Sequence, residues 1–250
     1  MSDLLLKSFL SAIGFLTILP APQEKEWDPA LYGRAGAWYP AVGAILGLLI
    51  GLFFALGSRF IPASVAAALT VIGWVVLSGG LHWDGLSDCC DGFFYAGTPE
   101  KRLAIMKDVN HGTFAVMGIV LTLLLKFSGI MALDPGKSII LFPLIAALSR
   151  WSILWMLRQP VISPNGMASS LKENLPRSAC WLAAILPLAL IILTKWTGVC
   201  LLALAAVINL LIGLMARRKV GGINGDVLGL TVEVTEALLV AAAAGLAGLY

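Results

Sequence analysis

Three aspartates in the glycine-rich stretch 79–92 are the side chains of this sequence best suited to chemistry: Asp84, Asp88 and Asp91. On a helix, their spacing places all three within about 60° on one face. Like charges on one face repel, which helix formation alone does not favour. Mg²⁺ takes oxygen ligands and is commonly shared with a substrate phosphate. The triplet therefore predicts a magnesium site, and the alternative is a solvated helix end whose acids simply face water.

A second polar cluster follows at residues 102–112. In this cluster, Arg102 and Lys107 are suited to hold a substrate phosphate, because both are cations. Asp108 adds a carboxylate that could help the metal site. The cluster therefore predicts phosphate contacts close to the aspartate triplet.

The same segment has a second interpretation, as an amphipathic helix at the membrane surface with its cations near lipid phosphates. Thr98 can cap this short helix, with Pro99 at its first position. In that arrangement Leu103 and Met106 face the membrane. Both interpretations predict a helix that begins at Pro99.

A third cluster surrounds Asp226, whose flanking glycines precede the last apolar segment. Glycine-rich backbone before a helix can present N–H groups to an anion, although the lysine and hydroxyl pair of a P-loop is absent here. The apolar segment itself contains Glu233 and Glu236. An acid within a membrane helix is costly and is usually paired or functional, so Glu233 either serves a substrate or pairs with Arg150 or Lys126.

The clusters together indicate phosphoryl transfer rather than hydrolysis. The chain has no Gly-x-Ser-x-Gly motif, no HExxH motif and no Ser-His-Asp order. A metal would neutralise phosphates, and an aspartate would take the proton from an attacking hydroxyl. His82 and His111 are either proton carriers or hydrogen-bonding core residues.

The composition shows where these residues are held. Apolar residues make up 59% of the 250 residues and charged residues only 12%, and the mean hydropathy is +0.93. A soluble protein has about 25% charged residues, so a soluble domain and a disordered chain are both excluded. A net charge of +3 without an arginine-rich arm is too small to argue for a nucleic-acid partner, and we expect none. Four cysteines without CxxC spacing indicate neither a zinc site nor a disulfide framework.

Apolar stretches of the length that a bilayer requires, about 20 residues, recur along the chain. We expect an all-α, polytopic membrane protein with about seven transmembrane helices and a short N-terminal apolar helix at about 4–19, which spans the membrane, lies at its surface or re-enters it. The predicted spans are 36–57, 61–82, 113–133, 138–157, 180–196, 198–215 and 228–249.

The distribution of lysine and arginine orients these helices. The loops on one face are 20–35, 83–112, 158–179 and 216–227, and they contain eleven of the 17 cations, whereas the opposite loops contain three. Loops rich in lysine and arginine stay in the cytoplasm. We therefore expect long cytoplasmic loops and a cytoplasmic active site. Since no internal repeat is evident, residues 1–250 are expected to form a single membrane-embedded domain.

Several ordered motifs along almost the whole chain resemble one family, the cobalamin (5′-phosphate) synthases, also called adenosylcobinamide-GDP ribazoletransferases. The motifs are Phe15-Leu16-Thr17, Tyr39-Pro40, Gly79-Gly80-Leu81-His82 with Asp84-Gly85-Leu86, Asp88 and Asp91-Gly92, Arg102-Leu103, Ile105-Met106-Lys107-Asp108, Gly112-Thr113-Phe114, Leu148-Ser149-Arg150-Trp151 and Gly225-Asp226-Val227-Leu228-Gly229 with Glu233 and Thr235-Glu236.

The resemblance implies the last joining step of the vitamin B12 nucleotide loop. A hydroxyl of α-ribazole, or of its 5′-phosphate, attacks the phosphorus attached to the cobinamide of adenosylcobinamide-GDP, and GMP leaves. It also implies Mg²⁺ as cofactor, the bacterial cytoplasmic (inner) membrane as location, and these two small molecules and the lipid bilayer as partners. A homo-oligomer or a complex with other B12 enzymes stays open.

We assign roles to the site residues as a hypothesis. Asp84 and Asp88 bind Mg²⁺, and Asp91 is the general base or a third ligand. Further metal or substrate contacts are expected from Asp108, Arg102, Lys107, Asp226, His82, Arg150, Glu233 and Glu236.

Three other functions compete with this interpretation. A CDP-alcohol phosphotransferase acting on a lipid uses the same metal chemistry but releases CMP. A small transporter would line its pathway with Glu233 and Lys126 and form no product. A scaffolding protein would not need three aspartates on one helix face.

Overall fold

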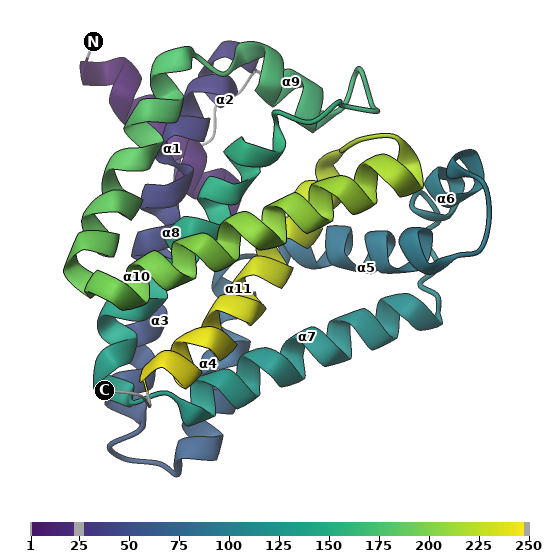
Figure 1. The fold of residues 1–250 in the computed structure, drawn as a ribbon. Helices are drawn as coiled ribbons and strands as arrows, with labels where there is room; N and C mark the ends of the chain where they lie inside the picture. Colours follow the sequence, from purple (N-terminus) through teal and green to yellow (C-terminus); the bar gives the residue numbers. More distant parts are fainter. Residues whose placement is uncertain (1, 23–27, 248–250) are drawn as a thin grey trace.

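The computed structural model describes residues 2–22 and 28–247, and this part of the chain is a bundle of α-helices (Figure 1). Within it, the extended pairing is a single isolated bridge between Val161 and Ile223. The all-α prediction is therefore confirmed. The helices are α1 (Ser2–Leu16), α2 (Pro29–Ala35), α3 (Tyr39–Gly57), α4 (Ala63–Leu77), α5 (Leu81–Phe94), α6 (Pro99–Ile105), α7 (Thr113–Ala132), α8 (Pro135–Met156), α9 (Met167–Asn174), α10 (Arg177–Val220) and α11 (Gly225–Ala247), with a 3₁₀ turn, η1 (Gly36–Trp38), between α2 and α3.

Five helices of the described residues are long and apolar enough to cross a membrane: α2 continuing into α3, then α7, α8, α10 and α11. This confirms a polytopic membrane protein. The predicted span at 61–82 is shortened to α4, which has 15 residues. A bend of 95° separates α4 from α5, and together the two helices are a sixth candidate span.

The two predicted spans at 180–196 and 198–215 are joined in α10, a helix of 44 residues. At 1.5 Å per residue such a helix would extend about 66 Å, roughly twice the hydrocarbon core. It is interrupted at Lys195, whose backbone has φ 55° and ψ −129°. Figure 1 shows the two halves of α10 running in different directions from this break. The break lies close to the boundary between the two predicted spans, so each half of α10 corresponds to one of the two apolar stretches.

Helix α1, predicted as a short apolar helix, has 15 residues and is not among the candidate spans. It packs on the turn before α3, where the rings of Phe9 and Trp38 meet edge to face with centroids 5.2 Å apart. The indole N–H of Trp38 donates a hydrogen bond to Ser8 Oγ at 3.1 Å. These contacts hold the N-terminal helix beside the cytoplasmic end predicted for α3.

Helices α3 and α8 lie side by side because α3 presents a stripe of glycines to α8. Gly43, Gly47 and Gly51 each lie so close to the α8 backbone that a Cβ atom would collide with a carbonyl group. The hydroxyl of Ser138 donates a hydrogen bond to the carbonyl of Gly51 at 2.9 Å. Close backbone approach through small residues is a usual way to pack membrane helices, since lipid supplies little hydrophobic force between them.

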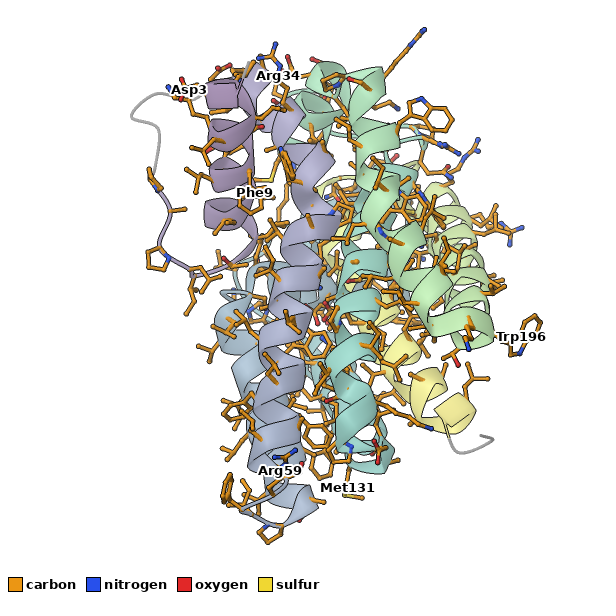
Figure 2. The ribbon with its side chains drawn as sticks, turned by 90° about the vertical axis from the view of Figure 1, so that its left-hand side faces the viewer. Asp3, Phe9, Arg34, Arg59, Met131 and Trp196 are labelled. Atoms are coloured by element: carbon orange, nitrogen blue, oxygen red, sulfur yellow. The ribbon has the colours of Figure 1, made fainter. Side chains whose placement is uncertain are left out.

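The described parts of the four loops predicted to share one face meet at one end of the molecule, where residues of 83–112 line a cavity together with residues of 158–179 and 216–227. Gly33 of α2 touches the backbone of Asn174 in α9, and Ile223 pairs with Val161. Figure 2 shows Asp3 and Arg34 at this end and Arg59 and Met131 at the other. Lys25, in the predicted loop 20–35, and residues 248–249, at the end of the last predicted span, lie outside the described residues.

Large apolar side chains cover the outside of the helices. Trp196 points away from the bundle (Figure 2), and its side chain is 63% exposed. Many leucines and isoleucines of α3, α7 and α10 are exposed as well. An exposed apolar surface of this extent is unfavourable in water and favourable in lipid.

Candidate active site

The turn between α4 and α5 sets the direction of the helix that carries the aspartate triplet. Gly79 and Gly80 have φ values of +64° and +65°. This left-handed conformation is costly for residues that have a Cβ atom. The two glycines therefore permit the sharp bend, and α5 then runs between α7 and α11 (Figure 1).

Helix α5 is in backbone contact with the start of α11. A Cβ on Gly85 would lie 2.6 Å from the carbonyl oxygen of Asp226. One turn later on α11, a Cβ on Gly229 would lie 3.0 Å from the carbonyl oxygen of His82. Asp84 is the residue before Gly85, so this contact brings Asp84 and Asp226 close together, although they are far apart in the sequence, and both line the same cavity.

These two aspartates line one cavity of about 330 Å³, which we call the α5 cavity. Its polar lining comes from His82, Asp84 and Asp226, and its apolar lining from α1, α3, α8, α9 and α11. A larger cavity of about 430 Å³, between α1 and Tyr32, is lined by none of the candidate acids on α5 or α11. The α5 cavity is therefore the one that can hold a substrate beside the aspartates.

Asp88 lies one turn after Asp84 and is close enough to Asp84, Asp226 and Asp91 for their charges to act on it. Within the described residues, no lysine or arginine forms a salt bridge with Asp84, Asp88 or Asp226. No group of three or more metal-ligating side chains is preassembled there either. The site thus concentrates negative charge that the described basic side chains do not neutralise.

Asp91 has a different environment from the other two aspartates of the triplet. One oxygen of its carboxylate accepts a hydrogen bond from Gly112 N–H at 2.5 Å, and the other accepts from Ala115 N–H at 2.9 Å. These are orphan donors at the first turn of α7, and a carboxylate there also opposes the positive end of the helix dipole. Asp91 therefore caps α7.

Arg102 was expected to hold a phosphate, and its guanidinium group is used inside the protein. It donates hydrogen bonds to the carbonyls of Gly92, Phe93 and Gly97 at 2.5 to 3.1 Å. The last carbonyls of a helix have no partner within the helix, and a cation is favourable at this end. Arg102 thus caps the C-terminal end of α5.

The helix predicted from Thr98 and Pro99 is confirmed as α6, and the Thr98 hydroxyl accepts from Lys101 N–H. The orientation predicted for it was wrong. Met106 is 3% exposed and packs on Gly92 and the protein core, and Leu103 packs on the same core. The reason is that the end of α5 covers α6 on the side that periodicity alone assigned to lipid.

Lys107 and Asp108 follow α6 but go to different places. Lys107 lines a second cavity of about 240 Å³, which we call the Lys107 cavity, together with Ser163, Asn224 and Asp226. Asp108 is exposed and accepts hydrogen bonds from the backbone N–H and side chain of Asn110, which hold the pKa of its carboxyl below the usual value. Asp108 is thus engaged in a local turn.

A buried cluster of charges lies beneath α5. Lys126 of α7 donates to Glu233 at 2.5 Å and to Glu236 at 2.7 Å, and Arg150 of α8 pairs with Glu236. All four side chains are at most 1% exposed. Two cations and two anions leave the cluster neutral, which is how charged groups are accommodated in a membrane interior. The structure therefore joins Lys126 and Glu233, which the transporter interpretation placed along a pathway, in a closed ion pair.

Comparison with known proteins places this arrangement in a family. The model of the cobalamin-5-phosphate synthase family matches residues 8–244. The chain belongs to the cobalamin-5-phosphate synthase family. No solved structure matches it.

Curated relatives of this cobalamin-5-phosphate synthase family member cover nearly all of its length, and each of the following is named adenosylcobinamide-GDP ribazoletransferase. The protein of Pseudomonas savastanoi pv. phaseolicola is 37% identical, over 91% of this chain and 95% of its own. That of Pseudomonas aeruginosa PAO1 is 40% identical, over 95% and 98%. That of Acinetobacter baumannii is 36% identical, over 93% and 94%.

Within this family member, the structure brings together only part of the predicted site. Asp84, Asp88, Asp226 and His82 lie around or beside the α5 cavity, and Lys107 lies beyond Asp226. The residues that make other contacts are Asp91, Arg102, Asp108, Arg150, Glu233 and Glu236.

Residue reasoning alone did not single out Phe15, Tyr39 and Met167, which line the α5 cavity. It also did not find the hydrogen bond at 2.9 Å between His111 Nδ1 and the Oγ of Ser87, which lies on the same helix as the aspartates. Phe15 and Tyr39 belong to motifs that carry the family resemblance, and these motifs are the sequence signal that could have identified them as site residues. Met167 gave none.

Proposed function

We propose that this protein is a magnesium-dependent adenosylcobinamide-GDP ribazoletransferase whose chemistry takes place between α5 and α11. Family membership and the names of the relatives carry the reaction, which is the final joining step of cobalamin synthesis. The observation that carries the location is the α5 cavity, where Asp84 and Asp226 meet beside Asp88.

In this reaction a hydroxyl oxygen of α-ribazole forms a bond to the phosphorus attached to the cobinamide. The bond from that phosphorus to the oxygen of the GMP unit breaks, and GMP leaves with the electron pair. The hydroxyl proton passes to a carboxylate of α5, Asp84 or Asp88. Coupled carboxylates share their titration, so the pair acts as one proton-accepting unit.

The donor set fits a hard divalent cation. Asp84, Asp88 and Asp226 supply oxygen only, and no described basic side chain neutralises them by a salt bridge. Mg²⁺ is usually held by one or two carboxylates plus substrate phosphates and water. Since the described residues preassemble no group of three such ligands, substrate phosphates and water would have to supply the remaining ligands. When bound, the ion would neutralise the charge of the diphosphate.

The chain's own residues do the remaining work. Asp91 and Arg102 both hold the C-terminal end of α5, because Asp91 ties it to α7 and Arg102 ties it to α6. Lys107 lies across Asp226 from the α5 cavity and is placed to attract phosphate.

The assay is GMP release by purified protein in detergent, with adenosylcobinamide-GDP and α-ribazole, in Mg²⁺ or in excess chelator. Release that needs both substrates and the metal supports the proposal. CMP release from a CDP-alcohol instead, or flux across sealed vesicles without product, would replace it with one of the competing functions.

We place the active site on the cytoplasmic side of the bacterial inner membrane. The support is the excess of lysine and arginine in the four loops that gather at the same end of the bundle. Inside-out membrane vesicles should release GMP from substrates added outside, and right-side-out vesicles should not. The reverse pattern would contradict this orientation.

A further inference from the structure

Asp226 separates two cavities of different chemistry. It lines the α5 cavity, of about 330 Å³, and also the Lys107 cavity, of about 240 Å³. Asp84 lines only the first, and Lys107 lines only the second. A reaction that joins two molecules needs both beside the same reacting atom, so two cavities that share a carboxylate suit a two-substrate enzyme.

The α5 cavity is lined mainly by aromatic and aliphatic side chains. Phe15 and Tyr39 stack with their ring centroids 5.9 Å apart and an angle of 25° between their planes. Met167 and Leu171 of α9 complete this side of the lining. Aromatic rings favour offset stacking on other rings, so this cavity is suited to an aromatic base.

The same cavity contains a buried polar atom without a partner. Nδ1 of His82 forms no hydrogen bond within the described residues, although the side chain is only 5% exposed. Leaving a buried polar group unpaired is costly, and most such groups in native proteins have a partner. His82 also lines the cavity, and a bound molecule that reaches Nδ1 would supply the missing partner.

The Lys107 cavity has the opposite character. Asn224 lines it, but its amide is used within the protein, since it donates to Asp226 at 2.6 Å and accepts from Val227 N–H at 3.1 Å. Lys107 and Ser163 contribute a cation and a hydroxyl to the lining. Such groups suit a phosphate and the hydroxyls of a ribose. Pockets for drug-sized ligands measure about 300–1,000 Å³, and a corrinoid is larger than such ligands. Cavities of about 330 and 240 Å³ are too small to hold one. The cobinamide must therefore remain outside both cavities.

From these contacts we propose that the α5 cavity binds the acceptor nucleoside, α-ribazole, and that the Lys107 cavity binds the phosphates of the leaving guanosine nucleotide. The base lies against Phe15 and Tyr39, and His82 Nδ1 makes a hydrogen bond to a polar atom of the nucleoside. The attacking hydroxyl then faces the carboxylates of α5, one of which takes its proton as the new O–P bond forms and GMP departs on the far side of Asp226. This assignment rests on the proposed function.

The test measures binding of each substrate alone to the full-length protein in detergent by calorimetry, with GMP release as a separate readout. Met167→Trp fills the α5 cavity from a half-exposed position, so it is expected to fold, and His82→Asn changes the unpaired group. Met131→Trp, on an equally exposed methionine at the opposite end of the bundle, is the matched control. Lys107→Ala changes the other cavity.

Met167→Trp and His82→Asn should each weaken α-ribazole binding by about tenfold or more, equal to about 1.4 kcal/mol, and leave adenosylcobinamide-GDP binding unchanged. Lys107→Ala should do the reverse, and Met131→Trp should change neither. The assignment is overturned if the wild-type protein binds both substrates and releases GMP but Met167→Trp leaves α-ribazole affinity unchanged or weakens the other substrate instead. Wild-type protein that binds neither substrate and releases no GMP would refute the proposed function itself.

Discussion

Gly85 of α5 lies directly on the backbone of Asp226 at the start of α11, so that a Cβ at Gly85 would be 2.6 Å from the Asp226 carbonyl oxygen. This contact joins the two halves of the candidate site, because it sets the distance between the carboxylates of Asp84 and Asp226. The site is therefore a property of how α5 and α11 pack as well as of the aspartates themselves.

Gly85→Ala should push α5 away from α11 and reduce GMP release by about tenfold or more, because overpacking shifts the backbone at a cost of about 1–3 kcal/mol. The control is Gly57→Ala, since a Cβ there meets nothing within 4 Å. The measurement is the initial rate with both substrates. Full activity of Gly85→Ala would mean that the spacing of the two helices does not matter.

Asp91 allows a test of capping against chemistry. Asp91 accepts with both carboxylate oxygens, whereas Asn has one acceptor oxygen and an NH₂ group that would face the second N–H, and loss of a cap costs about 0.5–2 kcal/mol. We expect Asp91→Asn to lose one of the two hydrogen bonds and Asp91→Ala to lose both, so thermal stability should fall in that order and activity should fall with it. If Asp91→Asn is as inactive as Asp91→Ala while remaining stable, Asp91 is a ligand or the base, as its place in the triplet first indicated.

Arg102→Gln should lower the thermal unfolding midpoint, because hydrogen bonds from a charged donor contribute about 1.5–3 kcal/mol. The Michaelis constant for adenosylcobinamide-GDP should not change, since the guanidinium is occupied by the carbonyls of Gly92, Phe93 and Gly97. Lys101→Gln, at an exposed position of the same helix, is the control. A raised Michaelis constant with unchanged stability would restore the phosphate-binding role.

The buried charge cluster predicts a large loss of stability on a single substitution and a partial recovery on a second one. Lys126→Met leaves Glu233 without its cation, and breaking a buried pair in this way costs about 3–5 kcal/mol. The double change Lys126→Met with Glu233→Gln removes one charge of each sign and should recover part of the thermal stability in detergent. Equal stability of the single and double variants would show that the pairing carries no energy.

The sequence was sufficient for features that depend on neighbouring residues. Thr98 and Pro99 predicted the start of α6, and the apolar stretches predicted α7, α8 and α11 to within a few residues. The number of membrane spans was harder to predict from the sequence. Hydropathy does not reveal that Gly79 and Gly80 turn the chain by 95°, whereas the break at Lys195 does lie close to the boundary between two predicted apolar stretches.

The candidate site was predictable by residue type but only partly by role. Asp84, Asp91 and Arg102 are all charged residues near glycines, and in sequence each could serve a substrate or a metal. Their roles differ because of partners elsewhere in the chain: the N–H groups of α7 for Asp91, the carbonyls of α5 for Arg102, and the cavity shared with Asp226 for Asp84. Long-range packing, which a single sequence does not display, decides between these roles.

The most direct test of the central claim is the rate of GMP release by Asp84→Asn and Asp226→Asn, with both substrates and Mg²⁺. Asp134→Asn, outside the candidate site, is the control. We predict a loss of about 100-fold or more for each of the two site variants at unchanged thermal stability, because both remove a carboxylate from the reacting centre. Near wild-type rates for both would contradict the assignment of the reaction to the place where α5 meets α11.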